Sequence, residues 1–356
     1  MRDYERVFPE MTNEERVRTL GNLINLCQSL ESIPPRKTEE NLLVASWNIK
    51  EFGHTTQRLP EAYFYIAQIL ERFDLIAVQE IKSTLWGLDR ITRLLGPDWK
   101  YLITDITGGD AGNRERSGYI FNSKRVQMSG LAREITLWKD ITDADELQQL
   151  KRTPYITGFL AGWKRFAMVN LHLHPDDGAD DVALRKKEVS FLLDALDAMD
   201  GKLWTENLIL VGDMNLYHGA DDDTVALIET VGFGEVEALK GVDTNASQNQ
   251  AYDRMFLTRN NYFQIAPNAL GQENGGVFDP YLTVYRDDQV MEYNDDMKAV
   301  YGGDPANLED DAKLLRYYQQ YWRRNQISDH FPIWVEMVTD NASQFLVEKR
   351  QELLTG

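Results

Sequence analysis

Residues Asn207 to Tyr217 read NLILVGDMNLY, and this stretch decides the fold. Leu208 to Val211 form an apolar run with the length and branching of a buried strand. Asp213 and Asn215 follow two residues apart, a spacing that points both side chains to one face of a strand. A carboxylate and a carboxamide at a strand end suit a hard cation, or a phosphate and its attacking water. Gly, Asp and Asn are also the usual turn residues, so this stretch alone is equally consistent with a simple turn.

Other predicted strands end in polar residues in the same way. The segments with strand character are 42–49, 74–80, 101–104, 118–122, 156–161, 166–173, 254–258 and 331–338. Helical patterns occur between some of them, for example from Pro60 to Phe73. Short hairpin-like spacings mixed with helical crossovers predict an α+β fold of two packed, mostly antiparallel sheets flanked by helices.

Composition limits the classes of function. The 356 residues include 57 acidic and 38 basic ones, a formal net charge of −19, which argues against nucleic-acid binding through a broad basic surface. A local basic cleft is still compatible with this balance. The single cysteine, Cys27, excludes an internal disulfide. The first residues lack the apolar core of a signal peptide and no window is apolar enough to span a membrane, so we expect a soluble, cytoplasmic protein without a membrane partner.

We expect one main domain with additions. Residues 1–40 form an N-terminal helical extension, in which Thr12 and Glu15 have capping-box spacing. Apolar residues at helical spacing from Val17 to Leu30 predict its buried face, with Cys27 as a small core residue. Residues 41–340 form the main domain, with an acidic insertion at 279–326 whose charges predict a solvated face and whose helix should run over 308–324. Residues 341–356 form a C-terminal helix or tail.

The polar residues at the strand ends match the needs of phosphodiester hydrolysis. They are Asn48, Glu80, His172, Asp213, Asn215, Asp329 and His330. Hydrolysis needs a cation to neutralise charge, a base for water, an acid for the leaving oxygen, and donors for the phosphoryl oxygens. Histidine suits the acid and base roles near neutral pH. Because the set lacks cysteine or clustered histidine ligands, the metal should be oxygen-bound Mg²⁺, with Mn²⁺ as the alternative.

These residues lie within motifs that resemble the endonuclease/exonuclease/phosphatase superfamily, most closely its deoxyribonuclease I-like members. The matching stretches, in the order of the family, are Ser46-Trp47-Asn48-Ile49 with Phe52-Gly53, Gln79-Glu80, Asn170-Leu171-His172, Gly212-Asp213-Met214-Asn215, Tyr252-Asp253-Arg254 and Ser328-Asp329-His330-Phe331-Pro332. The resemblance covers residues 42–338 apart from the insertion. It implies a single αββα sandwich with the site at one end.

The resemblance also implies a role for each matched residue. Glu80 would bind the metal, with Asn48 on metal or phosphate and Asp329 as a further metal or water contact. Asp213 and Asn215 would orient water and phosphate. His172 and His330 would be the acid–base pair, with His172 as the acid, and Glu115 and Asp253 would be their carboxylate partners. Arg152 resembles the arginine of the family that contacts phosphate.

Three functions follow from the sequence. The first is a Mg²⁺-dependent phosphodiesterase, a hydrolase that acts on DNA or RNA as a deoxyribonuclease I-like endonuclease. The second is a phosphatase or phosphodiesterase acting on a small or lipid-linked phosphate, which the charge of −19 favours. The third is a non-catalytic scaffold that binds partners through the insertion. The acidic balance, with neither a signal peptide nor a disulfide, departs from secreted nucleases and weakens the case for duplex DNA. The number of metal ions, endo versus exo cleavage and the oligomeric state are not determined by these patterns.

Overall fold

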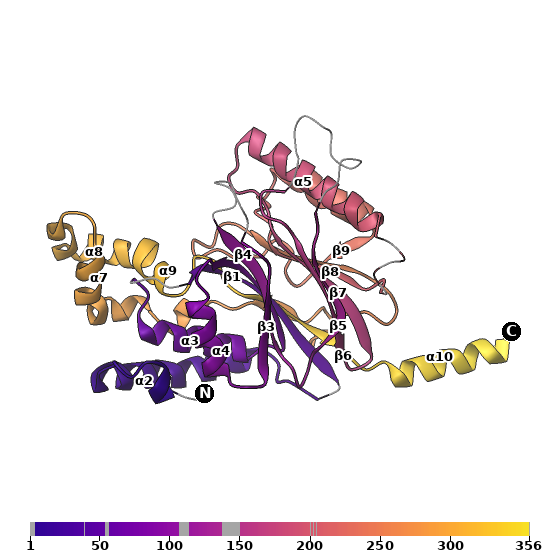
Figure 1. Ribbon diagram of the computed structural model, residues 1–356, viewed down its shortest axis with the longest axis horizontal. Helices are drawn as coiled ribbons and strands as arrows, with labels where there is room; N and C mark the ends of the chain where they lie inside the picture. Colours follow the sequence, from indigo (N-terminus) through magenta and orange to yellow (C-terminus); the bar gives the residue numbers. More distant parts are fainter. Residues whose placement is uncertain are drawn as a thin grey trace.

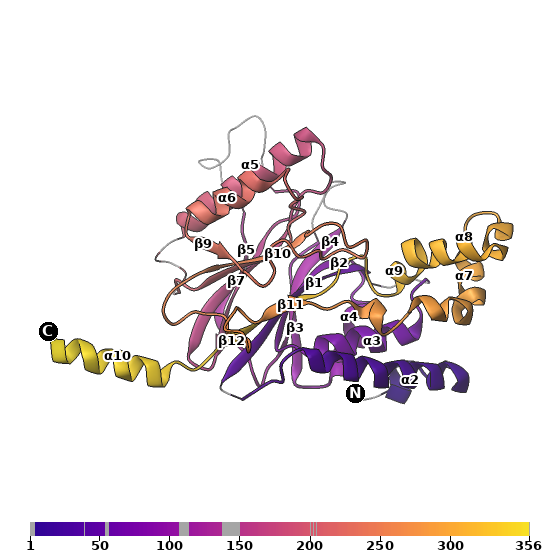
Figure 2. The ribbon, with the colours of Figure 1, turned by 180° about the vertical axis from the view of Figure 1, so that it is seen from behind.

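Two six-stranded sheets pack face to face between layers of helices in the computed structural model (Figures 1 and 2). The structure describes residues 4–38, 40–53, 57–106, 114–136, 150–199, 201, 203 and 205–355. The first sheet has the order β11 (Gly275–Val277), β12 (Ile333–Val338), β1 (Asn41–Phe52), β2 (Leu75–Lys82), β4 (Glu115–Asn122) and β3 (Trp99–Ile103). The second has the order β5 (Gln127–Glu134), β6 (Tyr155–Ala161), β7 (Lys164–His172), β8 (Leu208–Asp213), β10 (Asp253–Thr258) and β9 (Phe233–Glu235).

Each sheet contains one parallel pair, β1 with β2 and β7 with β8, and its other named pairs are antiparallel. The expected fold of two mostly antiparallel sheets is therefore confirmed. The parallel pairs matter for the site, because the carboxyl ends of parallel neighbours lie at the same edge of a sheet. Strands β1 and β2 also face β8 and β7 across the sandwich, which brings both pairs together.

Apolar side chains on both faces of the central strands explain the layers. In β1, Leu43, Ala45 and Trp47 pack toward the helices, whereas Leu42 and Val44 pack between the two sheets. This alternation is the two-residue period of a strand. A third cluster fills the space between the second sheet and its helices. Three buried layers thus separate four structural layers, and the polar sites are left to the ends of the strands.

Helices cover both outer faces (Figure 1). The first sheet is covered by α2 (Asn13–Ser29), α3 (Pro60–Glu71) and α4 (Trp86–Leu95), with the short α1 (Tyr4–Val7) beside α4. The second sheet is covered by α5 (Ala179–Asp197) and α6 (Asp222–Thr230). Helix α10 (Ala342–Thr355) projects away from the sandwich in both views. Within the described residues, no helix has the length and apolar character needed to cross a bilayer.

Residues 279–326 form a helical lobe beside the first sheet (Figures 1 and 2). It contains the 3₁₀ turns η3 (Pro280–Leu282), η4 (Asp287–Tyr293) and η5 (Pro305–Glu309), then α7 (Asn294–Val300), α8 (Asp311–Tyr317), a π turn (Tyr318–Trp322) and α9 (Arg323–Gln326). The lobe joins α2 and α3 through buried polar bonds. Arg18 pairs with Glu61 at 2.7 Å, and the Tyr293 hydroxyl donates to Glu61 at 2.7 Å. Gln289 donates to the Asn22 side chain at 3.1 Å.

The capping box of the N-terminal helix at Thr12 and Glu15 is confirmed, but its predicted buried face is wrong except at Leu30, which is buried at the end of the helix. Val17 and Ile24 are 72% and 61% exposed, and Cys27 is exposed rather than a core residue. The buried side is made by Thr19, Asn22, Leu23 and Leu26. The polar bonds of Arg18 and Asn22 to the neighbouring elements fix this orientation, which apolar spacing cannot anticipate.

The lobe helix also begins later than predicted. Asp310 caps α8, its side chain accepting from the Lys313 amide at 3.0 Å, so Leu308 lies in the preceding 3₁₀ turn. Three strands were not predicted. Strand β5 has mostly polar or half-exposed residues, while β9 and β11 have three residues each and contain glycine. Edge strands carry weak apolar patterns because they bury little side-chain surface.

Candidate active site

Four central strands deliver polar side chains to one end of the sandwich. Asn48 comes from β1, Glu80 from β2, His172 from β7 and Asp213 from β8. The Asn48 amide nitrogen donates to Oε1 of Glu80 at 3.1 Å and to Oδ2 of Asp213 at 2.9 Å, which ties the two sheets together. Nε2 of His172 lies 3.4 Å from the same Asp213 oxygen. The structure therefore brings these four predicted residues into one cluster.

The backbone at this end of the sandwich is tightly constrained. Glu80 and Asn215 have positive φ angles of 59° and 49°, although neither is glycine. Such conformations are uncommon for non-glycine residues and cluster at functional sites, where the surrounding structure holds them. Gly212 has a φ of 142° and pairs with Leu171 of β7. A Cβ at Gly212 would lie 2.0 Å from the Leu171 carbonyl oxygen.

We predict that Gly212→Ala destabilises the protein by at least about 3 kcal/mol, because the added methyl group overlaps backbone that cannot move freely. Gly219→Ala is the matched control, since Gly219 also has a positive φ of 79° but nothing lies within 4 Å of its Cβ position. The control should cost only about 1–2 kcal/mol. Urea unfolding of both variants measures the difference, and equal losses would contradict the steric explanation.

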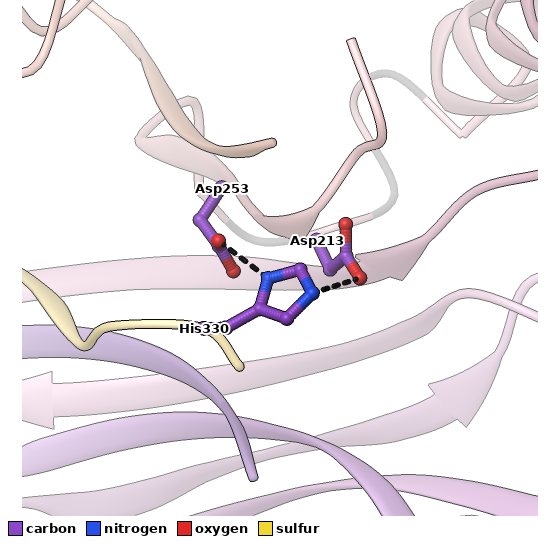
Figure 3. Close-up of side chains that lie close together, drawn as sticks. All are labelled: Asp213, Asp253 and His330. Atoms are coloured by element: carbon purple, nitrogen blue, oxygen red, sulfur yellow. Dashed lines mark hydrogen bonds and ion pairs between the residues drawn. The ribbon is translucent and has the colours of Figure 1, made fainter. Parts of the chain in front are cut away.

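His330 and Asp253 form a close pair beside Asp213 (Figure 3). Nδ1 of His330 lies 2.8 Å from Oδ2 of Asp253, and its Nε2 lies 3.7 Å from Oδ2 of Asp213. The Thr244 hydroxyl donates to the same Asp253 oxygen at 2.8 Å. Burial alone would lower the pKa of His330, but the charges of Asp253 and Asp213 outweigh it and raise that pKa well above its usual value. The two carboxylates thus favour the protonated form of His330.

His172 has the opposite electrostatic environment. Its Nδ1 lies 3.6 Å from Oε2 of Glu115. The Glu115 carboxylate also pairs with Lys82, through Oε1 at 3.1 Å, and with Arg152, through Oε2 at 3.3 Å. Burial, reinforced by the positive charges of Arg152 and His330, lowers the pKa of His172 well below its usual value. His172 is therefore neutral at pH 7. The two histidines differ in charge although each has a carboxylate neighbour.

Asp213 lies at the centre of the cluster. The Nε2 atoms of both histidines face its Oδ2. Burial raises the pKa of Asp213 to about 7. The positive charge of His330 opposes this increase, and the negative charge of Asp253 adds to it. Asn215 lies beside it, with its backbone N–H donating to Oδ1 of Asp213 at 3.2 Å and its side chain donating to the Leu173 carbonyl at 3.2 Å. Arg152 donates to the same carbonyl at 3.2 Å, so Asn215 and Arg152 approach one backbone group.

The surroundings of Glu80 fit a divalent cation. Its Oε2 accepts from the Glu51 amide at 2.9 Å, and burial together with the charge of Glu115 raises the pKa of Glu80. The Asn48 side-chain oxygen is buried and has no partner within the described residues. A buried carboxylate next to an unpaired amide oxygen is an incomplete set of oxygen ligands. A cation bound here would satisfy both groups.

Asp329 enters the site from the loop before β12. Its Oδ2 pairs with Nζ of Lys50 at 3.0 Å. Although burial acts in the opposite direction, the charges of His330 and Lys50 lower the pKa of Asp329. Ligand atoms of Asp213, Asp253 and His330 also lie within 4.8 Å of one another, close enough to share an ion. Their direct pairing favours proton handling instead, because an ion there would have to displace the bond between His330 and Asp253.

Sequence reasoning missed several residues of the site. Lys82 is one, and its position two residues beyond Glu80 on the same strand was the available signal. Thr244, which holds Asp253, and Lys50, which holds Asp329, are the others. The Ser328 hydroxyl joins the two sides of the site, accepting from the amides of Lys50 and His330 at 3.1 Å each. For Thr244, Lys50 and Ser328, nothing in the sequence spacing indicates the residues that they contact.

Comparisons with known proteins identify the family and the fold. The sequence profile of the endonuclease/exonuclease/phosphatase family matches residues 45–272. Human deoxyribonuclease-1 is 26% identical over 207 residues, which cover 56% of this chain and 67% of that protein. A Bacteroides thetaiotaomicron protein of the same family has a similar structure, with a TM-score of 0.52, 18% identity, and coverage of 85% of this chain and 96% of that one. A mannosyl-6-phosphatase of that organism gives a TM-score of 0.51, 17% identity, and coverage of 83% and 99%.

Proposed function

This chain belongs to the endonuclease/exonuclease/phosphatase family, and from that membership we propose that it is a divalent-metal-dependent phosphodiesterase that cleaves nucleic acid. One observation carries the proposal. Two histidines face the same oxygen of Asp213, and each has its own carboxylate neighbour, Glu115 or Asp253. Hydrolysis of a diester needs one group to accept the proton of water and another to protonate the leaving oxygen. Two histidines held in opposite charge states supply both.

The opposite pKa shifts favour a division of labour. His330, protonated beside Asp253, donates a proton to the leaving oxygen or stabilises its negative charge. His172, neutral beside Arg152, accepts the proton of the attacking water. The proposal thus gives His172 the role of base, whereas from the sequence we expected it to be the acid. Asp213 lies between them and orients the water.

The cation and the phosphate need separate ligands. Glu80 and the free oxygen of Asn48 would hold Mg²⁺ or Mn²⁺, with Asp329 as a further ligand once Lys50 is displaced. The bound cation would neutralise the charge that develops on the phosphoryl group. Arg152 and Asn215, which approach the Leu173 carbonyl together, would donate to the phosphoryl oxygens.

A small phosphate is the second candidate substrate. The net charge of −19 favours it, because a polymer of phosphates is repelled by an acidic surface. The similarity to a mannosyl-6-phosphatase is a similarity of fold alone. Similarity to human deoxyribonuclease-1 supports nucleic acid.

A substrate panel tests the proposal. Purified protein with Mg²⁺ should cleave at least one of plasmid DNA, single-stranded DNA and RNA, and EDTA should abolish the cleavage. The His330→Ala variant, prepared in parallel, measures any contaminating nuclease. Release of inorganic phosphate from sugar or lipid phosphates, with all nucleic acids left intact, would overturn the proposal and support the second candidate.

A further inference from the structure

The helix that leads into the catalytic loop has an exposed face unlike the rest of this acidic protein. Residues 312–327 contain four basic residues and no acidic one, whereas the whole chain has a net charge of −19. Helix α8, the π turn and α9 run without interruption from Asp311 to Gln326. The catalytic residues Asp329 and His330 follow directly. From the sequence we expected the charges of the whole insertion to form a solvated acidic face. In the structure, this basic stretch is a helix of its own that follows the acidic turns.

Burial divides the helix into two faces. The side chains of Leu314, Tyr318, Trp322 and Gln326 recur every four residues and are buried against the lobe. The opposite face carries Lys313, Arg316, Tyr317, Gln320, Tyr321 and Arg324, which we call the basic–aromatic face. These positions also repeat every three to four residues, so they form one stripe along the helix. From Lys313 to Arg324 the stripe is about 16 Å long at 1.5 Å per residue.

The upper part of this face contains an open aromatic groove. Its cavity of about 400 Å³ is lined by Tyr301, Tyr317 and Tyr321 together with Asn307, Lys313, Arg316 and Gln320. The Tyr321 side chain is 60% exposed, and its ring is nearly parallel to that of Tyr317 at 6.1 Å. The exposed Tyr321 ring, beside the half-buried Tyr317 and near two cations, offers a flat surface for a base and positive charge for the phosphate backbone.

The cations of this face are not neutralised within the described part of the chain. Lys313 donates to the amide oxygen of Asn307 at 3.1 Å, and Arg316 donates to that of Gln320 at 3.3 Å, so their partners are uncharged. Arg324 likewise bonds the Ser247 hydroxyl at 3.1 Å. Arg323 differs, because it pairs with Asp287 at 2.8 Å on the side of the helix toward the lobe. Among the four basic residues of this helix, the three on the basic–aromatic face therefore have no acidic partner in the described part of the chain.

The lower end of the face meets the active site. Arg324 contacts Ser247, and the neighbouring Ala246 amide donates to the Asp329 carbonyl at 2.7 Å. Asn245 forms a backbone bridge with His330 in the same loop. In both views, α8 and α9 extend from the lobe toward the end of β1 (Figures 1 and 2). A ligand lying along the face would therefore be led to the catalytic loop.

We propose that the basic–aromatic face binds single-stranded nucleic acid and guides it to the catalytic loop. This inference rests on the proposed function and specifies its substrate as an unpaired strand. Stacking on Tyr321 and Tyr317 requires bases that are free of a duplex, whereas the cations bind any phosphate backbone. The face also explains how a protein with a net charge of −19 can hold a polyanion, because the positive charge is local.

Fluorescence anisotropy tests the proposal with the full-length protein and a labelled oligothymidylate of about 16 nucleotides, in EDTA to prevent cleavage. Tyr321→Ala should raise the Kd on the order of tenfold, and Tyr321→Trp should restore tight binding. The double variant Lys313→Ala with Arg316→Ala should reduce the slope of log K against log salt by about 1.4, since each single-strand phosphate contact contributes about 0.7. Tyr321 is exposed, so these variants should keep the melting temperature of the wild type.

A matched control replaces one cation and one exposed aromatic residue elsewhere, Arg133 and Trp163, both by alanine. Unchanged binding in the control supports the proposal. An unchanged Kd in Tyr321→Ala, or an equal loss in the control, would overturn it. Equal affinity for the matching duplex would also overturn it, as would binding to phosphatidylserine vesicles through Arg316 without binding to the oligonucleotide.

Hydrolysis of a dinucleotide separates this inference from the proposed function, because it measures cleavage without the rest of the strand that the face would bind. If Tyr321→Ala cleaves the dinucleotide normally but binds the oligonucleotide weakly, the proposal is supported. If the wild type cleaves no nucleic acid, the proposed function fails, and the anisotropy result still decides whether the face binds a single strand.

Discussion

His330→Ala is expected to lower kcat by a factor on the order of 10² to 10⁴, with little change in KM or in the melting temperature. Its imidazole has one nitrogen on Asp253 at 2.8 Å and the other directed toward Asp213. The pKa of His330 is raised, so the proton is present at neutral pH and available to the leaving oxygen. The substitution removes the imidazole and its proton without disturbing the core, because the His330 side chain is only partly buried.

His218→Ala is the matched control for this variant. His218 also lies near a carboxylate, with 3.7 Å between its Nε2 and Asp243, but it is on the surface and outside the cluster. Steady-state cleavage of the best substrate from the panel should leave the control near wild-type kcat. Near-full activity of His330→Ala would remove this residue from the mechanism.

The dependence on pH gives a second measure of the same role. The active form of His330 is protonated, so activity should persist through neutral pH and fall as pH rises through its raised pKa. Asp253→Asn removes the negative charge that raises this pKa most. The alkaline limb of the pH–rate profile should then move to lower pH. A limb that stays in place would show that another group titrates.

Glu80→Ala is expected to raise the Mg²⁺ concentration needed for half-maximal activity by at least about tenfold to a hundredfold, since even residues that only orient a metal ligand have effects of this size. Burial and the charge of Glu115 raise the pKa of Glu80, so a charged Glu80 carboxylate in the metal-free site lowers the stability of the folded protein. Removing it should leave the metal-free protein as stable as the wild type, or more so.

Thermal unfolding with and without Mg²⁺ checks this prediction independently of activity. Mg²⁺ should raise the melting temperature of the wild type through binding to the native state, and this increase should be lost in Glu80→Ala. Glu51→Ala is the control, because its side chain is 65% exposed and only its backbone amide contacts Glu80. An unchanged Mg²⁺ midpoint in Glu80→Ala would place the metal elsewhere, for which Asp213 and Asp253 are the alternative ligands.

The sequence was informative where strand pattern and polar residues coincide. Glu80, His172 and Asp213 lie at the ends of buried strands. Parallel pairing of β7 with β8 brings His172 beside Asp213, and packing of β2 against β7 and β8 across the sandwich brings Glu80 to the same end. The four-layer fold could be predicted for the same reason, because alternating apolar faces require both sheets to be covered.

Long-range polar pairing could not be predicted. The apolar spacing of Val17 and Ile24 indicated a buried face, yet the bonds of Arg18 and Asn22 to α3 and the lobe turn that face to solvent. The pairing of Lys50 with Asp329 joins residues far apart in the chain. The helical spacing of Leu314, Tyr318 and Trp322 indicated the buried side of this helix, but the acidic composition of the insertion as a whole hid the basic character of the opposite face.

The most direct test of the two-histidine site is the rate of Mg²⁺-dependent cleavage of a single-stranded oligonucleotide by His172→Ala beside the wild type. His172 is predicted to accept the proton of water, so kcat should fall by a factor on the order of 10² to 10⁴ while the melting temperature and the Mg²⁺ midpoint stay close to those of the wild type. Cleavage at near the wild-type rate by this folded, metal-binding variant would contradict acid–base catalysis by the histidine pair.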